Sequence, residues 1–204
     1  VGNEGIILTT SDGGNTWVEQ ISGTNTLLFS VFFINENIGW AVGYFGIIRK
    51  TTDGGNNWIG QYSGTTNAIL QDICFRDPQN GTVVGGWTHI MRTTDGGNNW
   101  INQSNSTNHA LYGITYLDDN NGFAVGDMGT ILRTTDGGNT WASQSSGTNN
   151  QLRKVSFSDS NNGITVGLGG TYLTTTNGGN DWNLRSSGTI DFLCSVSFRF
   201  LIHI

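Results

Sequence analysis

The chain has 204 residues, of which 31 are Gly and only 1 is Pro, and its formal net charge is −6. Seven Trp, ten Phe and five Tyr argue against disorder, because disordered chains are poor in aromatic residues. Nine Lys and Arg in all argue against nucleic acid as a partner, which needs clustered cations. No apolar run reaches the roughly 20 residues that cross a bilayer, so no membrane insertion is expected.

Along the chain, an eight-residue sequence box recurs five times. Its copies are TSDGGNTW (10–17), TTDGGNNW (51–58 and 93–100), TTDGGNTW (134–141) and TTNGGNDW (175–182). The third positions are Asp12, Asp53, Asp95, Asp136 and Asn177, at spacings of 41, 42, 41 and 41. A period near 41 residues is typical of a four-stranded propeller blade.

The chain opens with Val1-Gly2, which matches the end of a strand at 42–43 in the first complete repeat. That repeat has four β-prone runs, named strands a to d in chain order, at 28–33, 39–43, 47–51 and 58–61. Three later repeats place Asn-Gly, the strongest short hairpin signal, between strands a and b, at 80–81, 121–122 and 162–163. Four-stranded antiparallel repeats of this kind predict an all-β, five-bladed β-propeller.

The two ends of the chain are complementary parts of one repeat. Residues 193–198 match strand a at 28–33, and 200–204 could supply strand b. We therefore expect a single domain whose ring closes by pairing these strands with strands c and d at the N-terminus. The alternative is an open fragment of a larger ring. The expected repeats are about 1–26 plus 192–204, 27–67, 68–109, 110–150 and 151–191.

Each box lies between strands c and d, where its Asp accepts bonds from nearby backbone N–H groups and its Trp folds back as an apolar plug. One Asp per box provides too few oxygens for calcium. The three His, at 89, 109 and 203, lie in different contexts, so no metal site is expected, and no cofactor is expected either. The box positions are predicted to be structural: Asp12, Trp17, Asp53, Trp58, Asp95, Trp100, Asp136, Trp141, Asn177 and Trp182.

The box resembles the Asp-box, or BNR repeat, of bacterial sialidases, sortilin-type receptors and xyloglucan-cleaving enzymes. The fuller repeat, with Gly-Trp-Ala-Val-Gly at 39–43 and Gly-Thr-Ile-Leu-Arg before the box at 134–141, is most similar to the photosystem II assembly/stability factor repeat. The resemblance covers the whole chain and implies a propeller, with Asp-boxes at the blade periphery. It also implies that an assembly or stability factor for a protein complex is one possible function.

Ligand-binding candidates are the side chains that vary against this constant frame. In a propeller the a–b and c–d turns share one face, and the b–c and d–a turns share the other. The turns of the second face contribute Glu4, Tyr44, Trp87, His89, Asp127 and Asp191. The innermost strands contribute Asp72, Tyr112, Arg153 and Lys154, and Asp72 with Lys154 could form either a structural ion pair or a pair that holds a ligand.

This pattern predicts a non-catalytic binding or scaffold module whose face and channel mouth meet a glycan or protein. The alternative is a carbohydrate-active enzyme, sialidase-like or another glycoside hydrolase, with acids such as Glu4, Asp72 or Asp127 at the channel mouth. No catalytic grouping is evident in the sequence. The chain begins without Met or a signal peptide, so we expect a mature or excised piece. Low Lys with plentiful Asn and Thr favours a secreted or periplasmic location, and a monomer is expected.

Overall fold

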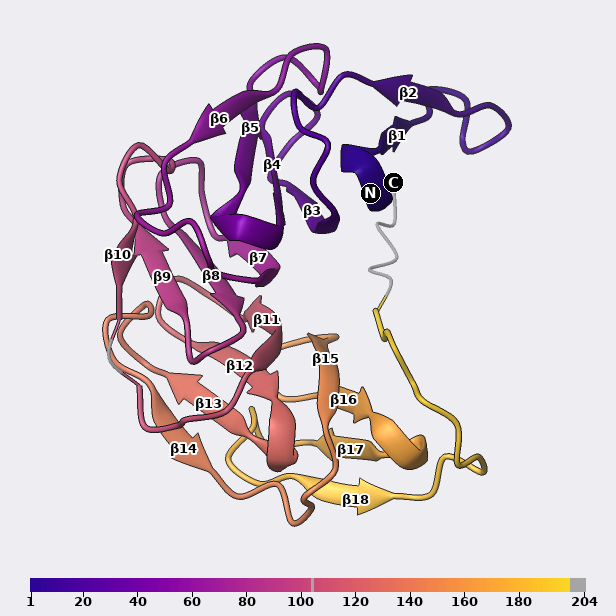
Figure 1. The fold of residues 1–204 in the computed structure, drawn as a ribbon. Coiled ribbons are helices and arrows are strands. Elements are labelled where there is room, and N and C mark those ends of the chain that lie inside the picture. The colour runs from indigo at the N-terminus through magenta and orange to yellow at the C-terminus, as the bar shows by residue number, and fades with distance from the viewer. Residues whose placement is uncertain (104, 199–204) are drawn as a thin grey trace. The chain divides into compact units, whose positions relative to one another are not determined.

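The computed structural model describes residues 1–103 and 105–198. It divides into two compact units, Val1–Asn102 and Gln103–Ile204. The regular elements are short β-strands and single 3-10 turns, so the chain is all-β (Figure 1). The strands form antiparallel sheets that repeat along the chain in a propeller-like manner.

The first unit holds a two-stranded sheet and two four-stranded sheets, in which each strand pairs with its neighbour in sequence (Figure 1). The first sheet is β1 (Ile7–Thr9) and β2 (Val18–Gln20); the second is β3 (Leu28–Phe33), β4 (Gly39–Gly43), β5 (Ile48–Thr51) and β6 (Ile59–Gln61); the third is β7 (Leu70–Phe75), β8 (Gly81–Gly85), β9 (Ile90–Thr93) and β10 (Ile101–Asn102). The strands predicted at 28–33 and 39–43 are therefore confirmed, with the same first and last residues.

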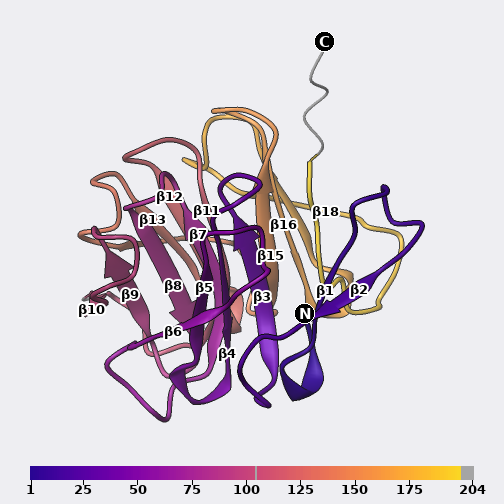
Figure 2. The same cartoon turned by 90° about the horizontal axis from the view of Figure 1, so that it is seen from above.

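The second unit holds two four-stranded sheets of the same order, and Figure 2 shows β15 and β16 of the second one from above. One comprises β11 (Leu111–Tyr116), β12 (Gly122–Gly126), β13 (Ile131–Thr134) and β14 (Ala142–Gln144); the other comprises β15 (Leu152–Phe157), β16 (Gly163–Gly167), β17 (Tyr172–Thr175) and β18 (Asn183–Arg185). The sequence prediction of repeating four-stranded antiparallel sheets is thus confirmed.

Each innermost strand carries one extra residue relative to its partner strand. The register shifts between Leu28 and Ser30, and the same shift recurs one residue into β7, β11 and β15. Such a bulge re-aims the side chain of the extra residue. The extra residues are Phe29, Gln71, Tyr112 and Arg153.

A tight turn leads into strand c in every repeat. Four of these turns are single 3-10 turns: η1 (Asn3–Gly5), η2 (Tyr44–Gly46), η3 (Asp127–Gly129) and η4 (Leu168–Gly170). Their central residue has a positive φ, and the glycine that follows has one too. The fifth turn, at 86–89, differs because Thr88 takes the place of that glycine; the φ values of Trp87 and Thr88 are 61° and 69°.

Apolar side chains from the inner strands form the cores. In the first unit Trp40 is fully buried and stacks on Phe75, with ring centroids 3.5 Å apart. In the second unit Phe123 is fully buried and stacks on Phe157 at 5.0 Å. By contrast, Phe33 on β3 is 40% exposed, because the sheet that precedes it has only two strands in the described part of the chain.

The predicted ring closure is not seen. The structure assigns no strand to residues 186–198, and 200–204 lie outside the described residues. Leu193 nevertheless begins as an innermost strand does, since its N–H donates to Gly167 O at 3.0 Å, as the N–H of Leu28 donates to Gly2 O. Phe198 N–H donates to Ser156 Oγ at 3.2 Å. The segment 193–198 is therefore anchored at both ends, but no partner strand is described for it.

Candidate functional site

Hydrogen bonds between turns define the two ends of each sheet. Gly54 N–H, in a c–d turn, donates to Asn37 O, in an a–b turn, at 2.9 Å. At the opposite end Gly170 N–H, in a b–c turn, donates to Asp191 O, in a d–a turn, at 2.7 Å. The Asp-boxes therefore share one end with the a–b turns, and the variable loops share the other.

The box carboxylates are occupied by their own turns. Asp136 Oδ1 accepts from Thr134 Oγ1 at 2.8 Å and from Thr140 N–H at 2.9 Å, while Oδ2 accepts from Thr140 Oγ1 at 2.6 Å. Bonds from Thr140, followed by the bond from Thr134, lower the pKa of Asp136 to about 2. In the last box Asn177 Nδ2 donates to Asp181 Oδ2 at 2.9 Å. The same turn therefore forms with the carboxylate at the seventh position of the box instead of the third.

The box tryptophans differ in burial. Trp58, Trp141 and Trp182 are 5–8% exposed, and Trp100 is half-buried. Trp17 is 58% exposed, so it does not form the apolar plug that the sequence predicts. The reason is again that the sheet β1–β2 has, among the described residues, no inner strands for Trp17 to cover.

In the second unit, two side chains donate hydrogen bonds to Asp127 in the turn η3, and a third packs on one of those two. Tyr112 Oη donates to Asp127 Oδ2 at 3.0 Å, and Gln151 Nε2 donates to Asp127 Oδ1 at 2.7 Å. The Arg153 guanidinium lies over the Tyr112 ring, 4.9 Å from its centroid. Burial, and then the bond and charge of Asp127, raise the pKa of Tyr112. We call these four residues the Asp127 cluster.

The first unit places aromatic rings at the corresponding positions. Phe29, at the bulge of β3, meets Tyr44 edge-on with centroids 5.0 Å apart, and Tyr44 contacts Phe45 at 5.9 Å. Phe45 is 66% exposed and Trp87, in the next b–c turn, is 79% exposed. The same frame thus carries an aromatic group in one unit and a polar, charged group in the other.

The remaining candidates are scattered. Asp72 is 3% exposed and accepts from Ser30 Oγ at 2.7 Å, so its carboxylate is not offered at a surface. Asp191 is exposed and accepts from Thr189 Oγ1 at 2.7 Å. The structure places the others as follows: Glu4 is exposed in η1, while His89 and Lys154 are half-buried. The predicted pair of Asp72 with Lys154 spans the two units and stays a prediction.

Sequence reasoning missed Phe29 and Gln151 as members of these groups. Gln151 lies just before β15 and reaches back to the preceding repeat, which no pattern within one repeat indicates. Phe29 occupies the bulge, and the alternation of a regular strand would have assigned it another direction. The sequence signal that could have located Phe29 is the variability at the second position of each innermost strand, whereas Gln151 lies outside these strands and has no such signal.

The family model of the photosynthesis system II assembly factor YCF48 matches residues 60–141 and 102–183, which is more than half of the chain. The chain belongs to the YCF48 family. Comparison with curated proteins finds no match. Among the described residues, no helix is long and apolar enough to cross a membrane, and no group of three His, Cys, Asp or Glu could hold a metal ion.

Solved structures with a similar fold include YCF48 proteins and a GH74 enzyme. The chain is similar to "YCF48 bound to D1 peptide" at 24% identity and a TM-score of 0.69, covering 85% of this chain and 57% of that one. YCF48 from Cyanidioschyzon merolae gives 16% identity and a TM-score of 0.70, with 93% and 69% covered. The GH74 enzyme of Niastella koreensis gives 21% identity and a TM-score of 0.72, covering 90% of this chain and 34% of that one. At these identities the likeness shows the fold alone, and the chain spans little more than half of the first relative.

Proposed function

We propose that this YCF48-family chain is a non-catalytic binding module that presents the end carrying its b–c and d–a turns to a peptide segment of another protein. The observation that carries the proposal is the Asp127 cluster. Tyr112, Gln151 and Arg153 come from two repeats, and each is fixed by a contact with another member. Groups held in place before binding lose little conformational entropy when a partner arrives.

The chemistry of the cluster suits a peptide. Stacking on Tyr112 orients the Arg153 guanidinium plane, and a guanidinium recognises carboxylates through paired hydrogen bonds. Tyr and Arg are also the residues that contribute most binding energy at protein interfaces. The YCF48 neighbour bound to D1 peptide gives a precedent within the family. The GH74 neighbour shares the fold and brings no activity to this chain.

We further propose that the chain forms a five-bladed ring in which residues 192–204 complete the repeat that begins with 1–26. The bonds of Leu193 and Phe198 to the neighbouring repeat support this proposal, because they anchor the segment where an innermost strand would begin and end. A variant that ends at residue 191 would then lose several degrees of melting temperature. An unchanged melting temperature would favour the open arrangement.

The binding proposal is tested with a random peptide phage library selected on the immobilised chain, together with titration of the D1 peptide. The matched variant is Tyr112→Phe, which removes only the hydroxyl. It introduces the residue that the first unit holds at the equivalent bulge position, Phe29. A second variant, Arg153→Gln, removes the stacked charge, and Arg185→Gln on the outermost strand β18 is the control.

Enriched peptides that lose affinity in Tyr112→Phe and Arg153→Gln, and keep it in Arg185→Gln, would support the proposal. Selection that enriches no peptide, or peptides equally bound by all variants, would overturn it.

A further inference from the structure

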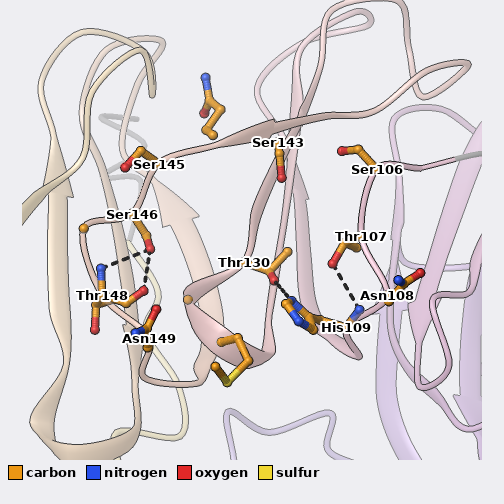
Figure 3. A pocket seen from close by; sticks show the side chains of 14 residues that line it. Ser106, Thr107, Asn108, His109, Thr130, Ser143, Ser145, Ser146, Thr148 and Asn149 are labelled. Atoms are coloured by element: carbon orange, nitrogen blue, oxygen red, sulfur yellow. Dashed lines mark hydrogen bonds between the residues drawn. The ribbon is translucent and has the colours of Figure 1, made fainter.

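The second unit also contains an open groove on the side of the d–a loops. The groove has a volume of roughly 670 Å³ and lies between the loop 106–109, residues 128–130, the strand β14 and the loop 145–149 (Figure 3). It is separate from the Asp127 cluster, since none of Tyr112, Asp127, Gln151 and Arg153 lines it. We call it the hydroxyl groove because Ser and Thr side chains dominate its walls.

The lining of the hydroxyl groove is polar and uncharged. Among the described residues that line it, none is Asp, Glu, Lys or Arg. Ser143 and Ser145 stand along one wall and Ser106 and Thr107 along the other (Figure 3). Met128 adds one apolar surface, because its side chain is 56% exposed. Hydroxyl groups both donate and accept hydrogen bonds, so this lining suits a ligand that does the same.

His109 is held in one tautomer. Thr130 Oγ1 donates its proton to Asp127 O at 2.6 Å, because a carbonyl oxygen only accepts. The same Oγ1 lies 2.9 Å from His109 Nδ1, so Nδ1 must carry the proton that joins them. The neutral ring then presents Nε2 as an acceptor.

The next repeat confirms this assignment of donor and acceptor. Asn150 stands where His109 does, and its Nδ2, which only donates, is 2.9 Å from Thr171 Oγ1. Thr171 Oγ1 in turn donates to Leu168 O at 2.6 Å. The position therefore requires a donor toward the threonine, and His109 adds a second nitrogen that Asn150 lacks.

The first unit contains the counterpart of one side of this groove, residues 4–5 and 19–25, without a counterpart of the loop 106–109, and its chemistry differs. It is lined by Glu4, Glu19 and Ile21 at the positions of Met128, Ser143 and Ser145, and its volume is roughly 370 Å³. The repeat frame therefore tolerates charged and apolar residues at these positions. The uncharged hydroxyl lining of the second unit is not required by the fold.

We propose that the hydroxyl groove is a binding site for a neutral oligosaccharide. Sugar hydroxyls would donate to His109 Nε2 and exchange hydrogen bonds with Ser143, Ser145 and Thr107, while Met128 would contact the apolar face of a sugar ring. Charged saccharides would gain nothing here, because the groove offers no opposite charge. The site is independent of the peptide-binding proposal and uses other residues.

The test is titration of the whole chain with neutral tetrasaccharides, namely cellotetraose, xylotetraose, mannotetraose and maltotetraose, with tetragalacturonic acid as the charged comparison. Binding is followed through the backbone amide resonances of the groove residues. The double variant Ser143→Glu/Ser145→Ile introduces the residues that the first unit already holds at these positions, so folding should be preserved. His109→Asn keeps the donor toward Thr130, as Asn150 shows, and removes the ring.

The expected result is that at least one neutral tetrasaccharide shifts the resonances of the groove. The double variant abolishes that binding, and His109→Asn weakens it about tenfold, as the loss of one good hydrogen bond does. The control variant Glu19→Ser/Ile21→Ser, in the first unit, should bind as the wild type does. The proposal fails if no neutral tetrasaccharide shifts these resonances, if the double variant still binds, or if tetragalacturonic acid binds more tightly.

Discussion

Ser30 donates a hydrogen bond of 2.7 Å to Asp72, and this bond joins the innermost strands β3 and β7 of neighbouring sheets in the first unit. Asp72 is 3% exposed, and a buried carboxylate is costly unless hydrogen bonds replace its water. The positions that correspond to these two in the second unit hold Gly113 and Lys154. The residue pair that joins neighbouring innermost strands therefore differs between the two units, although the backbone repeats.

Replacing Ser30 by Ala removes this donor and leaves part of the Asp72 carboxylate unsatisfied. We expect the variant to lose about 1–3 kcal/mol of unfolding free energy, the usual cost of orphaning a buried acceptor. Urea unfolding at neutral pH measures the change. Ser11→Ala, at an exposed box position, is the control and should stay within about 0.5 kcal/mol of wild type. Equal stability of the two variants would contradict the prediction.

The Asp-boxes make stability depend on acidic pH. Side-chain and backbone bonds from Thr16, followed by the bond from Thr10, lower the pKa of Asp12 to about 2, and the pKa of Asp136 is lowered to about 2 in the same way. A carboxylate with a lowered folded-state pKa contributes stability above its unfolded value near 3.8, and that contribution is lost as pH falls toward 2. We expect the urea midpoint to fall steeply between these values.

The matched variant for this effect is Asp136→Asn, because Asn177 occupies the same position in the last box. The variant cannot titrate at this position, so its urea midpoint should fall less between pH 5 and pH 2 than that of the wild type. Midpoints measured at both pH values decide the matter. A variant with the full acid dependence would show that Asp136 contributes none of it.

Trp58 and Trp17 are equivalent residues with different burial, 7% and 58% exposed. Trp58 meets Phe33 edge-on at 5.8 Å, and its Nε1 donates to Gln20 Oε1 at 3.2 Å. We expect Trp58→Ala to cost about 3–5 kcal/mol, as large-to-small changes in a core do. Trp17→Ala should cost less than about 1 kcal/mol. Thermal or urea unfolding of the two variants measures the difference, and similar losses would mean that Trp17 has a partner beyond the described residues.

The repeat made most of the fold predictable. Hairpin turns and Asp-boxes are local: the bonds of Asp136 all lie within four residues, so the sequence alone indicates them. The site was less predictable because it depends on contacts between repeats. The Asp127 cluster forms only because a bulge re-aims Tyr112 and because Gln151 reaches back from the next repeat. Trp17 shows the same limit, since its box is regular but the described part of the chain holds no inner strands beside it.

Thr88 is strained, because a β-branched residue at φ 69° is a conformational outlier. The other b–c turns have glycine here, and a Cβ at Gly46 would lie 2.3 Å from Thr65 O. We expect Thr88→Gly to raise the unfolding free energy by about 1 kcal/mol through relief of strain. Gly46→Thr, the reverse change in the neighbouring repeat of the same unit, should be strongly destabilising. Urea unfolding of both variants tests this, and a loss of stability in Thr88→Gly would show that contacts of its side chain outweigh the strain.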